Sequence, residues 1–149
     1  REAYAYGRIV FWERDEPVQE QSLSQSNRKL ALARPEFAPY GKAALEILEN
    51  FNHDLSNLAY GVNVNQVFAY IETGSVNAGF ISLSQALNQN LSPINYLIIS
   101  ESLHSKIEQQ FVIASNAKDW SEKFVDWVLS PAAQEIIINS GYRGIRLDD

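Results

Sequence analysis

The chain has 149 residues, 46% of them hydrophobic and 20% charged, a balance typical of one globular domain with its own core. Its formal net charge of −6 argues against nucleic-acid binding, which needs a basic surface. The absence of cysteine excludes disulfides, thiol nucleophiles and thiolate metal sites.

The first part of the chain has the pattern of strands joined to helices. Residues 7–13 (GRIVFWE) are β-branched and aromatic, so we expect a buried strand, followed by a polar loop over 16–27. A short strand is expected over 29–33 (KLALA). The two prolines and the glycine of 34–41 indicate a shaped loop, and a helical stripe of apolar residues follows over 42–52.

The middle of the chain repeats this order. A short strand over 59–62 leads to Asn63, which has the residue type of an N-cap, and a helix is expected from there to Thr73. Gly74 is a natural residue to end that helix. The segment 78–83 (AGFISL) then predicts another strand.

The C-terminal part contains two more strand patterns and two helix patterns. Strands are expected over 96–100 and 109–115, and helices over 119–129 and 131–140. The N-terminal caps that we expect are Asp119 or Ser121 for the first helix and Ser130 for the second, where Pro131 follows. Gly141 should end the second helix, and we expect the tail to Asp149 to be loose.

Strands that alternate with helices predict an α/β fold with a mainly parallel sheet flanked by helices and, here, a C-terminal helix pair. In such sheets, ligands bind beyond the carboxyl ends of the strands, often against helix N-termini. This rule directs attention to the strand-to-helix connections.

The sequence offers no pattern of catalytic residues. It has no dinucleotide-binding, phosphate-loop or nucleophile-elbow motif. His53 and His104 are far apart in the sequence, and we interpret both as solvated loop residues rather than a metal or catalytic pair. Glu46 and Glu49 are expected on a solvated helix face. We therefore predict that the chain is not an enzyme and holds neither a metal nor a cofactor.

Two strand-to-helix connections, APYG (38–41) and GVNV (61–64), are candidates for a site of another kind. Each is expected to bring a helix N-terminus to the end of a strand, where free N–H groups and the helix dipole attract anions without a charged side chain. Taken alone, plain strand-to-helix turns are the favoured explanation of the same pattern, because every α/β protein has such helix starts, so these two segments do not decide the function.

Longer stretches resemble periplasmic molybdate-binding proteins, the soluble receptors of ABC importers. The resemblance follows the same order along nearly the whole chain, and the segments that carry it are YAYGRIVFW, LALARPEFAPYGKAALEIL, GVNVNQVFAYIETGSVNAGFISLS, IEQQFVIAS and FVDWVLSPAAQEIIINSGY.

The resemblance implies a type II periplasmic-binding-protein fold with a molybdate or tungstate site in a cleft between two lobes. It implies anion-binding backbone N–H groups at Tyr40 and Val64. Some members carry a tyrosine hydroxyl where this chain has Ser82, so Ser82 is a weaker candidate. It also implies a periplasmic location, an ABC permease as partner, and membrane contact only through that permease.

The same resemblance predicts how the chain is divided. Residues 1–115 would form the second, ligand-binding lobe, and residues 116–149 would form helices that normally pack on a first lobe, expected to precede Arg1 together with any leader. Without that lobe, an apolar helix face would be uncovered and would favour self-association or refolding onto the chain's own sheet: Phe124, Trp127, Val128, Ile136 and Ile137. An effector-binding or interaction module on the same fold is the alternative hypothesis.

Overall fold

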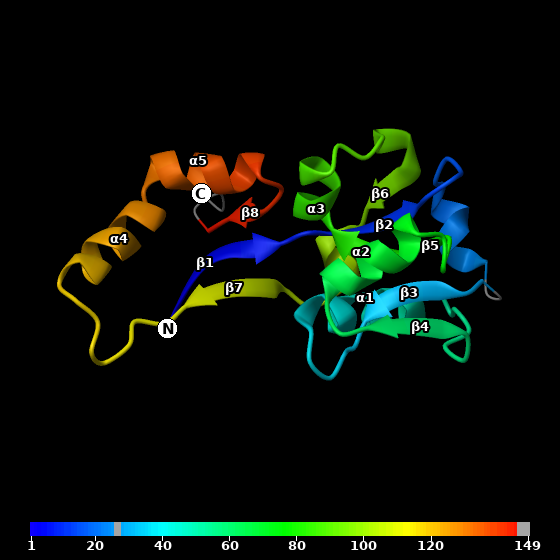
Figure 1. Cartoon of the computed structure of the whole chain (residues 1–149), viewed down its shortest axis with the longest axis horizontal. Coiled ribbons are helices and arrows are strands. Elements are labelled where there is room, and N and C mark those ends of the chain that lie inside the picture. The colour runs from blue at the N-terminus through cyan, green and yellow to red at the C-terminus, as the bar shows by residue number, and fades with distance from the viewer. Residues whose placement is uncertain (26–27, 146–149) are drawn as a thin grey trace.

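A computed structural model describes residues 1–25 and 28–145 of the chain (Figure 1). Its strands are β1 (Glu2–Gly7), β2 (Ile9–Glu13), β3 (Leu30–Ala33), β4 (Leu58–Gly61), β5 (Ala78–Ser82), β6 (Tyr96–Ile98), β7 (Ile107–Phe111) and β8 (Arg143–Gly144). Its α-helices are α1 (Pro39–Asn50), α2 (Val64–Glu72), α3 (Leu83–Asn88), α4 (Trp120–Val128) and α5 (Pro131–Asn139). Short 3₁₀ helices are η1 (Glu20–Ser24), η2 (Pro93–Asn95) and η3 (Glu101–Leu103).

The larger sheet has five strands in the order β4-β3-β5-β2-β6. The predicted α/β class is confirmed, but the mainly parallel sheet is a mixed one. β3 pairs in parallel with β4 and β5, whereas β2 pairs antiparallel with β5 and β6. The reason is that β2 enters from the edge where β5 ends, with Ile9 opposite Ser82, instead of arriving through a crossover helix.

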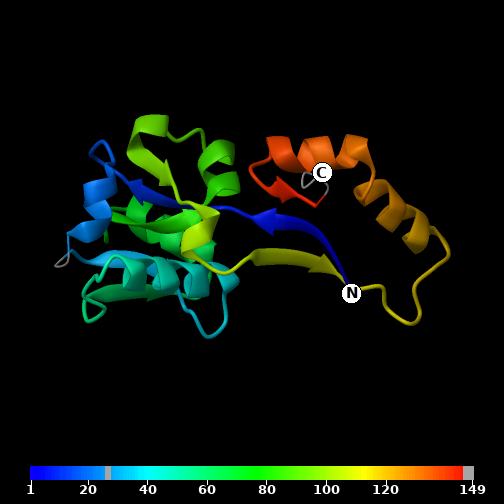
Figure 2. The same ribbon diagram turned by 180° about the vertical axis from the view of Figure 1, so that it is seen from behind.

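The smaller sheet is antiparallel, with the order β7-β1-β8. β1 and β7 run side by side from the larger sheet toward the C-terminal helices, as both Figure 1 and Figure 2 show. Where one strand was expected over 7–13, the structure has both β1 and β2, and the short β8 was not expected. The last long strand lies at Ile107–Phe111 instead of 109–115.

Helices cover both faces of the larger sheet because alternate strand residues point to opposite sides. On one face, Phe11 lies 5.3 Å from Phe80, measured between ring centroids, and packs in the core that includes Ile47 of α1. On the other face, Trp12 stacks on Phe68 of α2 with ring centroids 5.0 Å apart. α1 begins at Pro39, earlier than the expected 42, so the APYG segment is part of the helix.

The C-terminal segment packs on β1 through α5 and β8. Gln134, only 4% exposed, donates from Nε2 to the backbone oxygens of Tyr4 and Val128, both at 3.0 Å. Ser130 caps α5 as predicted, because its hydroxyl accepts from the backbone N–H of Ala133. Asp119, one of the two residues predicted for the N-cap of α4, occupies that position, but its side chain makes no capping bond.

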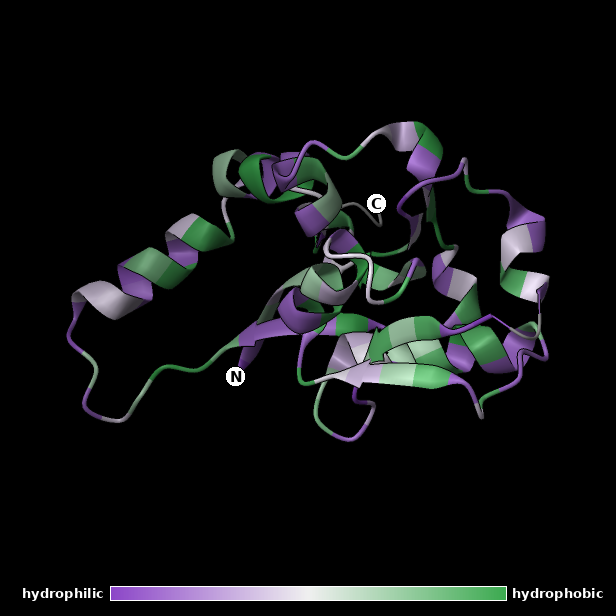
Figure 3. Cartoon of the chain, turned by 45° about the vertical axis from the view of Figure 1, so that its right-hand side comes forward, coloured by the Kyte–Doolittle hydropathy of each residue, from purple (hydrophilic) through white to green (hydrophobic). Residues whose placement is uncertain are grey.

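The outer face of α4 remains uncovered (Figure 3). Phe124 is 55% exposed and Trp127 is 53% exposed, and Ile136 is exposed as expected, whereas Val128 and Ile137 are half-buried. The expected loose tail lies largely outside the described residues, which end at Ile145. None of the helices in the described ranges is long and apolar enough to cross a membrane.

Candidate functional site

Three neighbouring parallel strands end at one edge of the larger sheet, and a helix begins after each of them. β4 leads to α2, β3 leads to α1 and β5 leads to α3. The side-chain amide of Gln85 in α3 donates to the side-chain oxygen of Asn65 in α2 over 2.8 Å. The strand order and this bond bring the helix starts into one region, as the rule for ligand sites in α/β sheets requires.

The start of α1 offers backbone N–H groups at the end of β3. Ala38 is the N-cap, and its carbonyl accepts from the N–H groups of Gly41 and Lys42 at 2.9 and 3.1 Å. Tyr40 is the second residue of the helix, so its N–H has no carbonyl one turn earlier to bond. A side chain at Gly41 would clash with the Ala33 carbonyl, so glycine allows the helix start to lie against the strand end.

The start of α2 is fixed by a reciprocal pair of hydrogen bonds. The Asn63 side chain accepts from the N–H of Gln66 over 3.0 Å, which confirms the predicted N-cap. The Gln66 side chain in turn accepts from the N–H of Val62 over 2.7 Å. These bonds hold the turn while leaving the N–H of Val64, the first residue of the helix, without an intrahelical acceptor.

Ser82 is the N-cap of α3 and is only 3% exposed. Its hydroxyl accepts from the N–H of Gln85 over 3.1 Å and lies 3.0 Å from the hydroxyl of Ser84. The residue therefore has a structural task at the end of β5, and its hydroxyl is already engaged.

Three tyrosines, Tyr4, Tyr40 and Tyr142, lie near one another at the end of β1. The ring of Tyr40 lies against Gly7, the last residue of β1, where a larger residue would clash with the phenol. Burial, and after it the proximity of Tyr142 and Tyr4, raise the pKa of Tyr40, so its phenol stays protonated and uncharged. No local sequence pattern indicates Tyr142 as a site residue, because it lies 58 residues from its contact Ser84.

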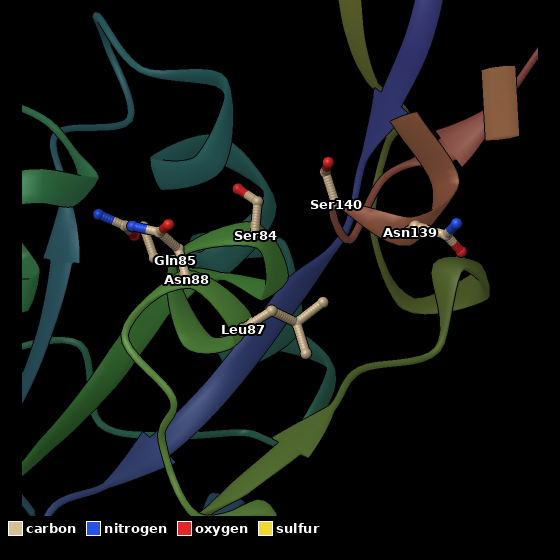
Figure 4. Close-up of a pocket in the computed structure, with 6 residues that line it drawn as sticks. All are labelled: Ser84, Gln85, Leu87, Asn88, Asn139 and Ser140. Atoms are coloured by element: carbon tan, nitrogen blue, oxygen red, sulfur yellow. The ribbon is translucent and has the colours of Figure 1, made fainter. Parts of the chain in front are cut away.

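A cavity of about 480 Å³ lies between α3 and the end of α5 (Figure 4). Every described residue that lines it is uncharged: Ser84, Gln85, Leu87, Asn88, Asn139 and Ser140. The hydroxyls and amides in this set offer both donors and acceptors, and none of them adds a positive charge.

Several side chains differ from their predicted environments. His53 is buried, with 5% exposure, and His104 is half-buried, so the interpretation of both as solvated is wrong. Glu46 is not simply solvated, because it accepts hydrogen bonds from the N–H and hydroxyl of Ser105. Within residues 1–25 and 28–145, no group of three or more histidine, cysteine, aspartate or glutamate side chains could hold a metal ion.

Trp120 and Trp127 of α4 are 63% and 53% exposed. Trp127 stacks on Phe124 with ring centroids 6.1 Å apart, and both rings face outward from α4. These tryptophans therefore belong to a surface rather than to a core.

Comparisons with known proteins match residues 1–143 to a family described as bacterial extracellular solute-binding protein. The chain is 30% identical to the molybdate-binding protein ModA of Azotobacter vinelandii, over 95% of this chain and 60% of that protein. It is 31% identical to YvgL of Bacillus subtilis, which carries the name of an ABC transporter substrate-binding lipoprotein, over 86% of this chain and 51% of that protein.

Among solved structures, the periplasmic molybdate-binding protein of Azotobacter vinelandii matches with a TM-score of 0.80 and 26% identity. That match covers 95% of this chain and 66% of the solved chain. The chain thus spans between about half and two thirds of the length of these similar proteins.

Proposed function

The chain belongs to the bacterial extracellular solute-binding protein family, and from that premise we propose that it binds a tetrahedral oxyanion, molybdate or tungstate, for an ABC importer. The observation that carries this proposal is the pair of unbonded N–H groups of Tyr40 and Val64, which begin neighbouring helices at one sheet edge. Ser82 is a weaker candidate for ligand binding, and its contribution is to fix the start of α3 beside these two helices.

The electrostatics favour capture by neutral donors. A chain of net charge −6 cannot rely on a general positive potential to attract an anion. The N-terminus of a helix carries about half a positive charge and presents backbone N–H groups in a fixed direction. Such donors need no lysine or arginine, and they recognise an oxyanion by the number and direction of its oxygen atoms.

The similar proteins support the ligand and the location. The Azotobacter protein is named as molybdate-binding, and its solved structure is described as periplasmic. We carry both properties to this chain as part of the proposal, together with a role in binding rather than catalysis. The ABC transporter in the name of YvgL supports a membrane permease as the partner.

We also propose that two parts of the chain have different roles. Residues 1–115 contain the larger sheet and the helix starts that bind the anion. Residues 116–149 contain α4 and α5, whose uncovered apolar side chains are a docking surface rather than part of the anion site. In the isolated chain, this surface favours self-association.

A proline substitution tests the N–H of Val64 directly. Proline lacks an N–H but is tolerated at the first position of a helix, and Asn63 before it already has the extended backbone that proline requires. We expect Val64→Pro to weaken molybdate binding about tenfold or more, since a hydrogen bond to a charged group contributes roughly 1.5–3 kcal/mol.

The measurement is a molybdate titration followed by ¹H–¹⁵N NMR, which reports weak binding residue by residue. The Tyr40 and Val64 amide signals should shift with molybdate and much less with chloride at equal ionic strength. Val64→Ala is the matched control, because it shortens the side chain and keeps the N–H. Shifts confined to other regions, or equal affinities of the proline and alanine variants, would contradict the proposal.

A further inference from the structure

We propose that the hydroxyl of Tyr142, contributed by the segment after α5, is a further binding group that donates a hydrogen bond to the captured oxyanion. This inference rests on the proposed function, and it adds a side-chain donor to the backbone donors of Tyr40 and Val64.

A row of hydroxyl groups leads from the end of β5 to Tyr142. The hydroxyl oxygens of Ser82 and Ser84 lie 3.0 Å apart. The hydroxyl of Ser84 donates to the phenolic oxygen of Tyr142 over 3.4 Å. Only the Ser84 hydroxyl therefore separates Tyr142 from Ser82, the position that the sequence indicated for a side-chain donor. Tyr142 reaches this place from the C-terminal part of the chain.

Tyr142 is the member of this row whose proton remains available. The Ser82 hydroxyl is buried and serves as the cap of α3, and the Ser84 hydroxyl donates to Tyr142. Tyr142 accepts in that contact, and among the described residues no hydrogen bond is recorded in which its own hydroxyl donates. A phenol is also more acidic than the hydroxyl of serine, which favours donation to an anion.

The backbone around Tyr142 is held from both sides. Gly141 has a φ of +94°, and a Cβ there would lie 2.9 Å from the backbone nitrogen of Ser84, so only glycine lets the turn approach α3 this closely. On the other side, Arg143 pairs with Tyr6 in the smaller sheet. The side-chain oxygen of Gln134 accepts from the N–H of Ile145 over 3.0 Å, which fixes the segment further.

Tyr142 also reaches toward the start of α1. It is near enough to Tyr40 to be one of the groups that raise the pKa of the Tyr40 phenol, after the larger effect of burial. Tyr142 thus lies near both Ser84, the second residue of α3, and the phenol of Tyr40, whose own N–H is at the start of α1.

The test compares Tyr142→Phe with Tyr4→Phe in the full 149-residue chain. Each substitution removes one hydroxyl and keeps the ring, and Tyr4, stacked on Phe111, also lies near Tyr40. Molybdate dissociation constants come from the amide shifts, and the ligand-induced tyrosine difference spectrum is recorded in parallel. We expect Tyr142→Phe to bind roughly 10- to 100-fold more weakly and to lose the difference signal, while Tyr4→Phe retains both.

The outcomes separate this inference from the proposed function. Equal molybdate affinity of Tyr142→Phe and the wild type would overturn the inference and leave the backbone site intact. An equal loss in Tyr4→Phe would also overturn it, because the effect would then not be specific to the Tyr142 hydroxyl. If the wild-type amides do not respond to molybdate, the proposed function fails and this inference fails with it.

Discussion

The carboxylate of Glu46 joins α1 to the loop that leads into β7. It accepts a hydrogen bond from the hydroxyl of Ser105 over 2.8 Å and another from the Ser105 backbone N–H. Burial acts to raise the pKa of Glu46, but these bonds, with Lys42 and His104 nearby, outweigh it and hold the pKa below its ordinary value. The contact therefore stabilises the fold only while the carboxylate is charged.

This shift predicts a specific dependence of stability on pH. A carboxylate whose pKa is lower in the folded state contributes fully above its unfolded pKa of about 4.3, and the contribution is lost as pH falls through the folded value. We expect Glu46→Gln to lower the free energy of unfolding at neutral pH and to approach the wild type in acid. Urea unfolding over a pH series measures this difference. Glu49→Gln, an exposed carboxylate on the same helix, is the control, and a pH-independent offset for Glu46→Gln would contradict the assignment.

Local residue roles could be predicted from the sequence, and environments created by distant residues could not. The caps Asn63 and Ser130 bond to backbone groups three residues away, so residue type and position were sufficient. His53 is buried by contacts that no local pattern indicates. Tyr142 meets Ser84 across 58 residues, and for that reason no local pattern indicated this contact.

At the scale of elements, the longer periodic segments were predictable and the short strands were not. α1 and α2 have apolar stripes that specify a buried face without reference to the rest of the fold. β1 forms by pairing with two distant strands, β7, where Glu2 lies opposite Phe111, and β8, which has only two residues. The direction of β2 likewise depends on where it enters the sheet, which explains why the sheet is mixed.

The N-terminal caps of α2 and α4 allow a matched test, because only one of the two predicted cap residues makes a side-chain bond. Asn63 accepts the N–H of Gln66, whereas Asp119 makes no capping bond. We expect Asn63→Ala to cost about 1 kcal/mol of unfolding free energy and Asp119→Ala to stay within about 0.5 kcal/mol of the wild type. Chemical denaturation of both variants gives the comparison. Equal losses of unfolding free energy in the two variants would contradict the prediction that the Asn63 hydrogen bond stabilises α2.

At the scale of the whole molecule, the proposed anion-binding edge and the uncovered apolar face lie on different parts of the chain. The edge could be anticipated, because parallel strands that end together bring the following helix starts together. The apolar face could be anticipated only in part. Whether α4 and α5 fold back depends on long-range contacts such as that of Gln134 with Tyr4, which holds α5 against β1 while α4 and Ile136 of α5 stay exposed.

The uncovered face leads to a prediction about assembly. Its large apolar side chains lie on α4 and are each more than half exposed: Trp120, Phe124 and Trp127. Burying apolar area yields about 25 cal/mol per Å², so a second copy of the chain gains free energy by covering it. We expect the wild type to associate as concentration rises in sedimentation velocity, and the double variant Phe124→Glu, Trp127→Glu to sediment as a monomer.

The control for this experiment places the same charge elsewhere. Ile94 is 63% exposed but lies in η2, beside the larger sheet and apart from α4, so Ile94→Glu should associate as the wild type does. A monomeric wild type at every concentration would refute the prediction, as would equal association of all three proteins. Because Phe124 and Trp127 lie outside the anion-binding edge, the double variant should also keep the molybdate-dependent shifts of Tyr40 and Val64. Loss of those shifts would mean that the two surfaces are coupled and that assembly belongs to the binding function.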